Sequence, residues 1–158
     1  MQRIAEDKFP LIASRTVSQA SPVTLEEIIA EFQELGDWDA QCDYLIDLGY
    51  ELPKLPAEAK TEANRVRGCQ SNVWMTAHFT PGDSPVVEFI ANSDAIIVNG
   101  LIAVLMAVFN RRTAREILTT DARAVFAQLG LERHLSSQRR NGLYGMVERI
   151  RQLALAAA

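Results

Sequence analysis

Early in the chain, hydrophobic residues recur at intervals of three and four, which is the spacing of helices with one buried face. Thr24 followed by Glu27 forms a capping-box pattern that predicts the start of a first helix, and Gly36 marks its end. Asp37 is placed to cap a second helix, which is expected to end at Gly49. The pattern therefore predicts two consecutive amphipathic helices.

The repeat then shortens to two residues, the spacing of a strand with one buried face. Apolar and polar side chains alternate over residues 73–79, segment 81–85 is rich in Pro and Gly, and residues 86–91 supply a returning strand. This order predicts an antiparallel hairpin. Because a lone hairpin is only marginally stable, we expect a further strand or packed helices to support it, and residues 1–22 or residues 50–55 could contribute that strand.

Helical spacing returns in the second half of the chain. Ser93 and Asp94 are placed to cap an apolar helix from residue 95 to about Phe109, which is too short to cross a bilayer comfortably and is expected in the core. Further caps predict more helices, at Thr113 with Glu116, at Asp121, and at Ser136 or Ser137. The pattern is that of a helix-rich protein interrupted by one strand pair.

A chain of 158 residues is long enough for one domain with its own hydrophobic core. Residues 1–22 are mixed in character and end in Ser21-Pro22, so we interpret them as an N-terminal arm and residues 23–158 as a single domain. The net charge of −4 argues against general binding to nucleic acid. No segment near the N-terminus has the apolar core of a signal peptide, so a reducing, cytoplasmic location is expected.

Cys69 is the strongest candidate for chemistry, because it lies where a long connection meets the start of the first predicted strand. Only a thiolate attacks an electrophile, and nearby cations and exposed backbone N–H groups lower the pKa of a thiol. Arg65 and Arg67 flank this cysteine, and Gly68 lets the backbone turn beside it. The alternative is a buried, unreactive thiol, since free cysteine is among the most buried residue types.

Other kinds of site find little support in the sequence. It contains no glycine-rich phosphate loop, and Cys42 and Cys69 have neither the spacing of a disulfide framework nor, with the histidines, that of a zinc site. His78 lies about 30 Å along the predicted strand from Cys69, at roughly 3.3 Å per residue, which is too far for a base. His134 is a candidate base only if the fold brings it to the thiol.

Several segments, in order, carry the motifs of a known family. The most specific is the run Gly68-Cys69-Gln70-Ser71 followed by Val73-Trp74. The others are residues 45–49 with 52–53, residues 93–95, residues 97–104, and residues 134–136 leading to 139 and 141–143. Together these segments resemble the SufE/CsdE family, the sulfur-acceptor partners of group II cysteine desulfurases in iron–sulfur cluster assembly.

The resemblance implies an α+β fold, in which a small antiparallel sheet packs against helices, as in the scaffold protein IscU. It also implies that Cys69 accepts sulfur from the persulfide of a desulfurase, stimulates that enzyme, and passes the sulfur to a cluster-assembly scaffold. The pyridoxal phosphate belongs to the desulfurase, so neither a cofactor nor a metal is expected on this chain. It would be a sulfur carrier rather than a stand-alone enzyme.

The residues beside Cys69 have two interpretations each. Arg65 and Arg67 either stabilise the thiolate or form ion pairs. Gln70 and Ser71 are expected to shape the loop through hydrogen bonds to its backbone. We also expect the thiol to rest in an apolar pocket and to swing out when a partner docks, because a persulfide needs shelter from water and small thiols.

More distant residues of the motifs are expected to act indirectly. Asp94 is expected to cap its helix rather than to contact sulfur. Arg139 and Asn141 match the family motif near the last helix, where partner docking and internal packing are both plausible. Gln138 departs from that motif, since family members commonly carry serine there.

Three other functions remain as alternatives. An IscU-like scaffold would need several thiolate or histidine ligands around one site, and only Cys69 occupies a matching position. A thiol redox sensor would need Cys42 to leave its helix face and act as the resolving cysteine. A binding module could activate a desulfurase allosterically without carrying sulfur.

Overall fold

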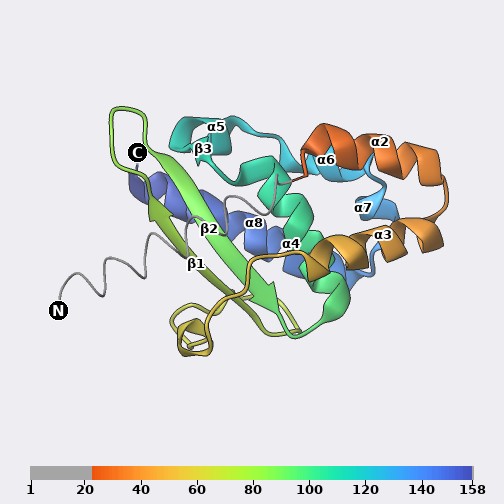
Figure 1. The fold of residues 1–158 in the computed structure, drawn as a ribbon, viewed down its shortest axis with the longest axis horizontal. Helices are drawn as coiled ribbons and strands as arrows, with labels where there is room; N and C mark the ends of the chain where they lie inside the picture. Colours follow the sequence, from red (N-terminus) through yellow and green to blue (C-terminus); the bar gives the residue numbers. More distant parts are fainter. Residues whose placement is uncertain (1–22, 158) are drawn as a thin grey trace.

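The computed structural model describes residues 23–157 and has an α+β fold, as the resemblance implies (Figure 1). A sheet of three antiparallel strands, in the order β1-β2-β3, packs against helices. The predicted N-terminal arm, residues 1–22, lies outside the described residues. The elements, in chain order, are α2 (Leu25–Leu35), α3 (Trp38–Tyr50), the short 3-10 helix η1 (Ala57–Ala59), β1 (Val73–Phe79), β2 (Val86–Ser93), α4 (Ile96–Phe109), β3 (Arg112–Thr113), α5 (Ala114–Thr119), α6 (Ala122–Gln128), α7 (Leu131–His134) and α8 (Ser137–Ala157).

The first two helices begin where the sequence predicts. Thr24 and Glu27 form the reciprocal capping box of α2, and Gly36 ends that helix with a φ of 80°. The Asp37 carboxylate accepts a hydrogen bond from the Ala40 N–H at the start of α3. Local capping chemistry therefore sets these boundaries, because it satisfies backbone N–H groups that have no partner inside the helix.

The predicted hairpin is confirmed, with residue 73 of β1 opposite residue 93 of β2 and residue 79 opposite residue 87. Of the two origins considered for a further strand, residues 1–22 lie outside the described residues and residues 50–55 do not join the sheet. Strand β3 comes instead from the turn after α4, where Val86 and Val87 pair with Thr113 and Arg112. A strand this short has no alternation that sequence reasoning could detect.

The predicted core helix is confirmed as α4, and most of its side chains are buried, including those of Leu101, Ile102 and Leu105. It crosses α3 at two glycines. A Cβ added to Gly100 would lie 2.4 Å from the Leu45 carbonyl oxygen. The glycines thus allow the two helices to pack backbone to backbone, and Gly49 serves this contact instead of ending α3.

Helix α8 closes the fold along the core. Its buried face carries Leu143, Met146, Val147 and Ile150, and packing continues to the fully buried Ala154. Within residues 23–157, no helix is long and apolar enough to cross a membrane. The long, buried face of α8 is what positions the site, because the segment around Cys69 packs against it.

Candidate functional site

Cys69 lies on a short loop, residues 67–71, which we call the cysteine loop. Gly68 within it has a φ of 90°, a conformation that residues with side chains rarely adopt. Immediately before the loop the chain is tied to β1, since the Val66 N–H donates to the Val73 carbonyl at 2.8 Å. The loop therefore leaves the edge of the sheet from a fixed point and turns sharply at the glycine.

The other end of the cysteine loop is held by Asp94, whose predicted role as a helix cap is wrong. Its carboxylate accepts hydrogen bonds from the Asn72 backbone N–H at 3.1 Å and from the Asn72 Nδ2 at 2.9 Å. The helix begins after Ala95 with no side-chain cap, and the Ala95 N–H donates instead to the Ser93 hydroxyl. Asp94 thus anchors the loop rather than the helix.

Helix α8 presents two glycines to the cysteine loop. A Cβ added to Gly142 would lie 3.3 Å from the Cys69 Sγ, and one added to Gly145 would lie 2.7 Å from the Arg67 carbonyl oxygen. These positions are three residues apart and therefore share one face of the helix. The missing side chains let the loop lie directly on the helix backbone.

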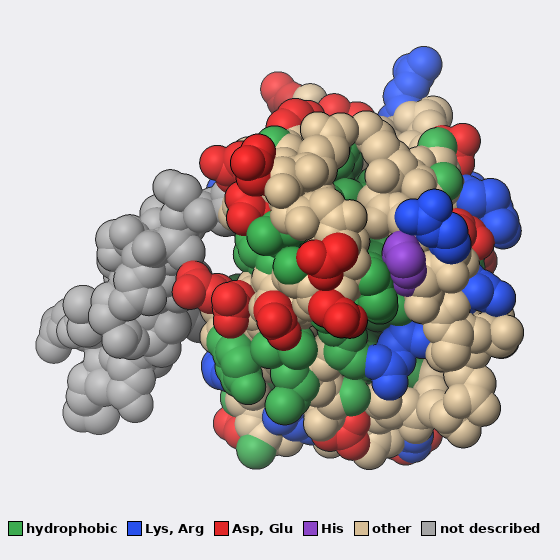
Figure 2. All heavy atoms as spheres, turned by 90° about the vertical axis from the view of Figure 1, so that its right-hand side faces the viewer, with side chains coloured by type: hydrophobic (Ala, Val, Ile, Leu, Met, Phe, Trp, Pro, Cys, Tyr) green, Lys and Arg blue, Asp and Glu red, His purple; other side chains and the backbone are tan. Residues whose placement is uncertain are grey.

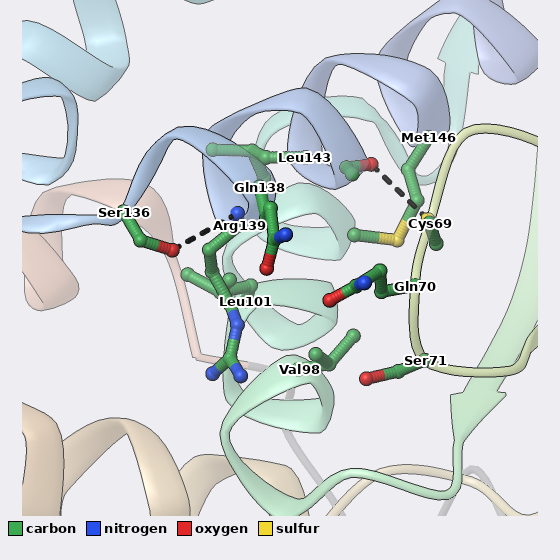
Figure 3. Close-up of a pocket in the computed structure, with 11 residues that line it drawn as sticks. Cys69, Gln70, Ser71, Val98, Leu101, Ser136, Gln138, Arg139, Leu143 and Met146 are labelled. Carbon is green, nitrogen blue, oxygen red and sulfur yellow. Dashed lines mark hydrogen bonds between the residues drawn. The ribbon is translucent and has the colours of Figure 1, made fainter.

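The Cys69 thiol is half-buried and donates a weak hydrogen bond to the Gly142 carbonyl, with Sγ to O at 3.4 Å (Figure 3). In front of it is a cavity of about 70 Å³. Figure 3 shows Met146 extending from α8 toward the thiol and Gln70 pointing across the cavity. The other lining residues are Ser71, Val98, Leu101, Ser136, Gln138, Arg139, Gly142 and Leu143. The thiol therefore rests beside a mixed pocket, with buried apolar side chains of α4 and α8 on one side and polar side chains around it.

Burial raises the pKa of the Cys69 thiol, and the nearby Arg65 guanidinium lowers that pKa by less. The expectation that flanking cations acidify the thiol is thus correct for Arg65 in direction, but desolvation outweighs the charge. Burial therefore favours the neutral thiol, which is a weaker nucleophile than the thiolate.

The two arginines before Cys69 both approach Glu62. The Arg67 guanidinium forms an ion pair with the Glu62 carboxylate at 2.9 Å, and the Arg65 guanidinium is 3.8 Å from it. Of the two interpretations, Arg67 therefore follows the ion pair. Arg65 forms a long ion pair and also lowers the pKa of the Cys69 thiol.

The remaining residues predicted for the site fall into two groups. Gln70, Ser71 and Arg139 line the cavity, although in residues 23–157 neither Gln70 nor Ser71 makes a side-chain hydrogen bond to the loop backbone. Arg139 donates its backbone N–H to the Ser136 hydroxyl, which begins α8, and its side chain forms no ion pair with any described residue. Asn141 is exposed and does not line the cavity.

The histidines and the second cysteine are engaged elsewhere. His78 pairs with Glu88 on the hairpin at 2.9 Å, and His134 stacks on Trp38 with ring centroids 4.7 Å apart. Neither lines the thiol cavity, so His134 does not act as its base. Cys42 lies on α3, where burial and then the neighbouring carboxylates raise the pKa of its thiol. Across the described part of the chain, no cluster of His, Cys, Asp or Glu is placed to hold a metal ion.

Sequence reasoning missed the role of α8. Gly142 belongs to a recognised motif, but nothing in the pattern shows that it and Gly145 lie beneath the cysteine loop. Arg149, one turn further along, donates to backbone carbonyls before the loop and was not identified at all. The available signal was the pair of glycines three residues apart inside a helix, where each costs stability unless it allows a close contact.

The fold and the sequence can be compared with known proteins. A solved solution structure of a hypothetical protein from Thermus thermophilus has a TM-score of 0.65 and 18% identity, covering 87% of this chain and 98% of that one. At this identity the likeness concerns the fold alone.

Sequence relatives are more similar. An uncharacterised SufE-like protein of Rhizobium meliloti (strain 1021) is 42% identical over 132 residues, which is 83% of this chain and 94% of the relative. A second, from Rhizobium etli, is 44% identical over 137 residues, covering 85% and 92% of the two chains. Residues 26–154 match the SufE family, described as an Fe-S metabolism associated domain. The cysteine loop, its anchors and the glycine face of α8 all lie within that match, and the chain belongs to the SufE family.

Proposed function

We propose that Cys69 accepts a sulfur atom from the persulfide of a partner cysteine desulfurase and carries it onward for iron–sulfur cluster assembly. The Cys69 thiolate attacks the outer sulfur of the partner's persulfide, and a new S–S bond forms on Cys69. The partner's S–S bond breaks, and its cysteine leaves as a thiolate. The thiol proton goes to water. The pyridoxal phosphate that generates the persulfide belongs to the desulfurase, so this chain acts as a sulfur carrier.

The observation that carries the proposal is the placement of the Cys69 Sγ. It lies on a short loop, next to a cavity of about 70 Å³ whose inner wall is formed by Val98, Leu101, Leu143 and Met146. A thiol alone leaves this space empty, and an added sulfur atom would enter it. The buried apolar side chains would then cover one side of the persulfide, while polar side chains line the other side.

The raised pKa of the Cys69 thiol fits transfer that occurs only on docking. A thiol that is neutral in its pocket reacts slowly with small electrophiles. When the cysteine loop moves into a partner's active site, the desolvation by its own pocket ends and the thiol ionises more readily. Transfer also clears the partner's persulfide, so we expect turnover of the desulfurase to rise in its presence.

The test is transfer of label from radioactive cysteine by a pyridoxal-phosphate-dependent desulfurase. We expect the wild-type protein and a Cys42→Ser control to carry protein-bound, thiol-releasable label, and the Cys69→Ser variant to carry none and to stimulate no turnover. An unlabelled Cys69→Ser variant that still stimulates turnover would instead identify an allosteric activator. Label lost equally from both cysteine variants would favour a redox pair.

A further inference from the structure

Arg149 joins α8 to the chain before the cysteine loop. Its Nη1 donates to the Arg65 carbonyl at 3.3 Å, and its Nη2 donates to the Ala63 carbonyl at 3.2 Å. The chain at residues 61–65 forms hydrogen-bonded turns, and the guanidinium fork reaches two of its carbonyls at once. Because both acceptors are backbone atoms, the contact holds the path of the chain rather than any one side chain.

The contacts between α8 and this segment weaken toward Cys69. At Arg149 they are two hydrogen bonds from a charged guanidinium, at 3.3 and 3.2 Å. At Gly145 and Gly142 the helix offers no side chain, and the recorded hydrogen bond is the weak one from the Cys69 thiol at 3.4 Å. That last bond also disappears when the thiol loses its proton, since a thiolate has no hydrogen to donate.

We propose that Arg149 is a positioning residue for sulfur transfer: it clamps residues 63–65 to α8, so that only the cysteine loop moves when Cys69 is delivered. The inference rests on the proposed function, because that function requires the cysteine loop to move. Arg149 would hold the chain just before the loop in place during this movement. Asp94 holds the opposite end through Asn72. The loop is thus released between two anchors while Arg65, whose charge acts on the thiol, stays in place.

The experiment measures alkylation of Cys69 by iodoacetamide in the free protein, with Cys42 of the same molecules as an internal reference, by peptide mass spectrometry. Arg149→Met removes the donors and keeps the apolar stem, and Arg149→Lys restores one cationic donor. Arg151→Met is the matched control, because Arg151 on the same helix donates to the distant Leu118 carbonyl at 3.3 Å. A thermal melt of each variant accompanies the measurement.

We expect Arg149→Met to raise the Cys69-to-Cys42 ratio of alkylation rates about fivefold, the effect of losing a modest net hydrogen-bond contribution to loop closure. Arg149→Lys should fall between this variant and wild type, and Arg151→Met should leave the ratio unchanged. An unchanged ratio in Arg149→Met, or an equal rise in Arg151→Met, would overturn the proposal. So would acceleration of both cysteines together, which would indicate general unfolding.

The outcome is independent of the sulfur-transfer experiment, because no desulfurase is present. If Cys69 failed to accept label while Arg149→Met still exposed it, the proposed function would fail and the clamp would stand. If label transfer succeeded but the alkylation ratio did not respond, the clamp alone would be excluded.

Discussion

The chemistry of Cys69 depends on two opposing effects on one atom. Desolvation in the α8 pocket raises the pKa of the thiol, and the Arg65 charge lowers it by less. In the proposed sulfur carrier, this balance would favour the protonated sulfur between encounters while a cation nearby would stabilise the thiolate during transfer. Reactivity is thus governed by where the loop lies rather than by a dedicated base.

The alkylation rate of Cys69 is expected to depend on pH. In a Cys42→Ser background, the alkylation rate of Cys69 should rise with an apparent pKa above that of an unfolded peptide spanning the cysteine loop, and Arg65→Gln should raise it further. The folded state holds this proton more tightly than the unfolded chain does. Its contribution to stability is therefore present below the ordinary cysteine pKa and is lost as the pH rises through the raised value. An apparent pKa at or below that of the peptide would contradict the conclusion that desolvation outweighs the Arg65 charge.

A second outcome concerns Asp94. Replacing it with Ala removes both hydrogen bonds to Asn72, and we expect a loss of about 1 kcal/mol in the free energy of unfolding by urea, together with faster alkylation of Cys69. Asp94→Asn keeps an acceptor for the Asn72 N–H and should recover most of the loss. Asp83→Ala, in the exposed hairpin turn, is the control and should change neither quantity. Equal effects at the two positions would exclude a specific anchor.

At the scale of the elements, sequence patterns located helices better than they located contacts. Local patterns were sufficient to predict α2, α5 and β1. They consist of the capping boxes at Thr24 and Thr113 and the two-residue repeat of β1, which reflect local hydrogen bonds and one buried face. Strand β3 was not predicted, and the roles of Asp94 and Gly49 were predicted wrongly. Each depends on a neighbour distant in sequence, which local propensity does not encode.

The same dependence on distant neighbours explains why some site residues could be inferred from the sequence and others could not. The motif around Cys69 pointed to it as the candidate for chemistry, and the residues before it were recognised as its neighbours. The glycine face of α8 and Arg149 lie more than seventy positions away along the chain. Only the packing of α8 beneath the loop connects them, so no spacing within the sequence points to them.

A third outcome belongs to the crossing of α3 and α4. Gly100→Ala should destabilise the protein by about 2 kcal/mol or more in urea unfolding, because the added Cβ would meet the Leu45 carbonyl at 2.4 Å and overpack the core. Alanine is otherwise the better helix former, so helix propensity alone predicts an increase in the free energy of unfolding. Gly145→Ala, whose added Cβ would meet the Arg67 carbonyl at 2.7 Å on a surface loop rather than in the core, is the comparison and should cost less. A stabilised Gly100→Ala variant would show that the crossing is loose.

Across the whole molecule, charge is divided between two regions. Every charged side chain between residues 23 and 52 is acidic, whereas arginines predominate between residues 111 and 151. Figure 2 shows the acidic side chains gathered on one part of the surface and Lys and Arg side chains mainly on another. Like charges on α2 and α3 repel one another, so this part of the fold carries an electrostatic cost at low ionic strength.

The fourth outcome follows from this division. Glu34→Lys, at the exposed end of α2, should raise stability by roughly 0.5 kcal/mol at low salt and should weaken the stabilising effect of added salt. Glu148→Lys, beside Arg149 and Arg151 on α8, should have the opposite sign. Thermal melts at low and physiological ionic strength provide the measurement. The same sign for both substitutions would mean that the division of charge has no energetic effect.

The two anchors of the cysteine loop also set its reach. Between Val66 and Asn72 the chain has a contour of only about 20 Å at roughly 3.3 Å per residue, so the Cα atom of Cys69 at its midpoint can travel no further than about 10 Å from the protein body. Cys69 can therefore react only with a group that comes close to the surface of this protein. A donor cysteine at the bottom of a deep, narrow channel would be inaccessible to it. Any partner must either carry its persulfide near the rim or provide a depression broad enough to admit the ends of β1 and α8 along with the loop.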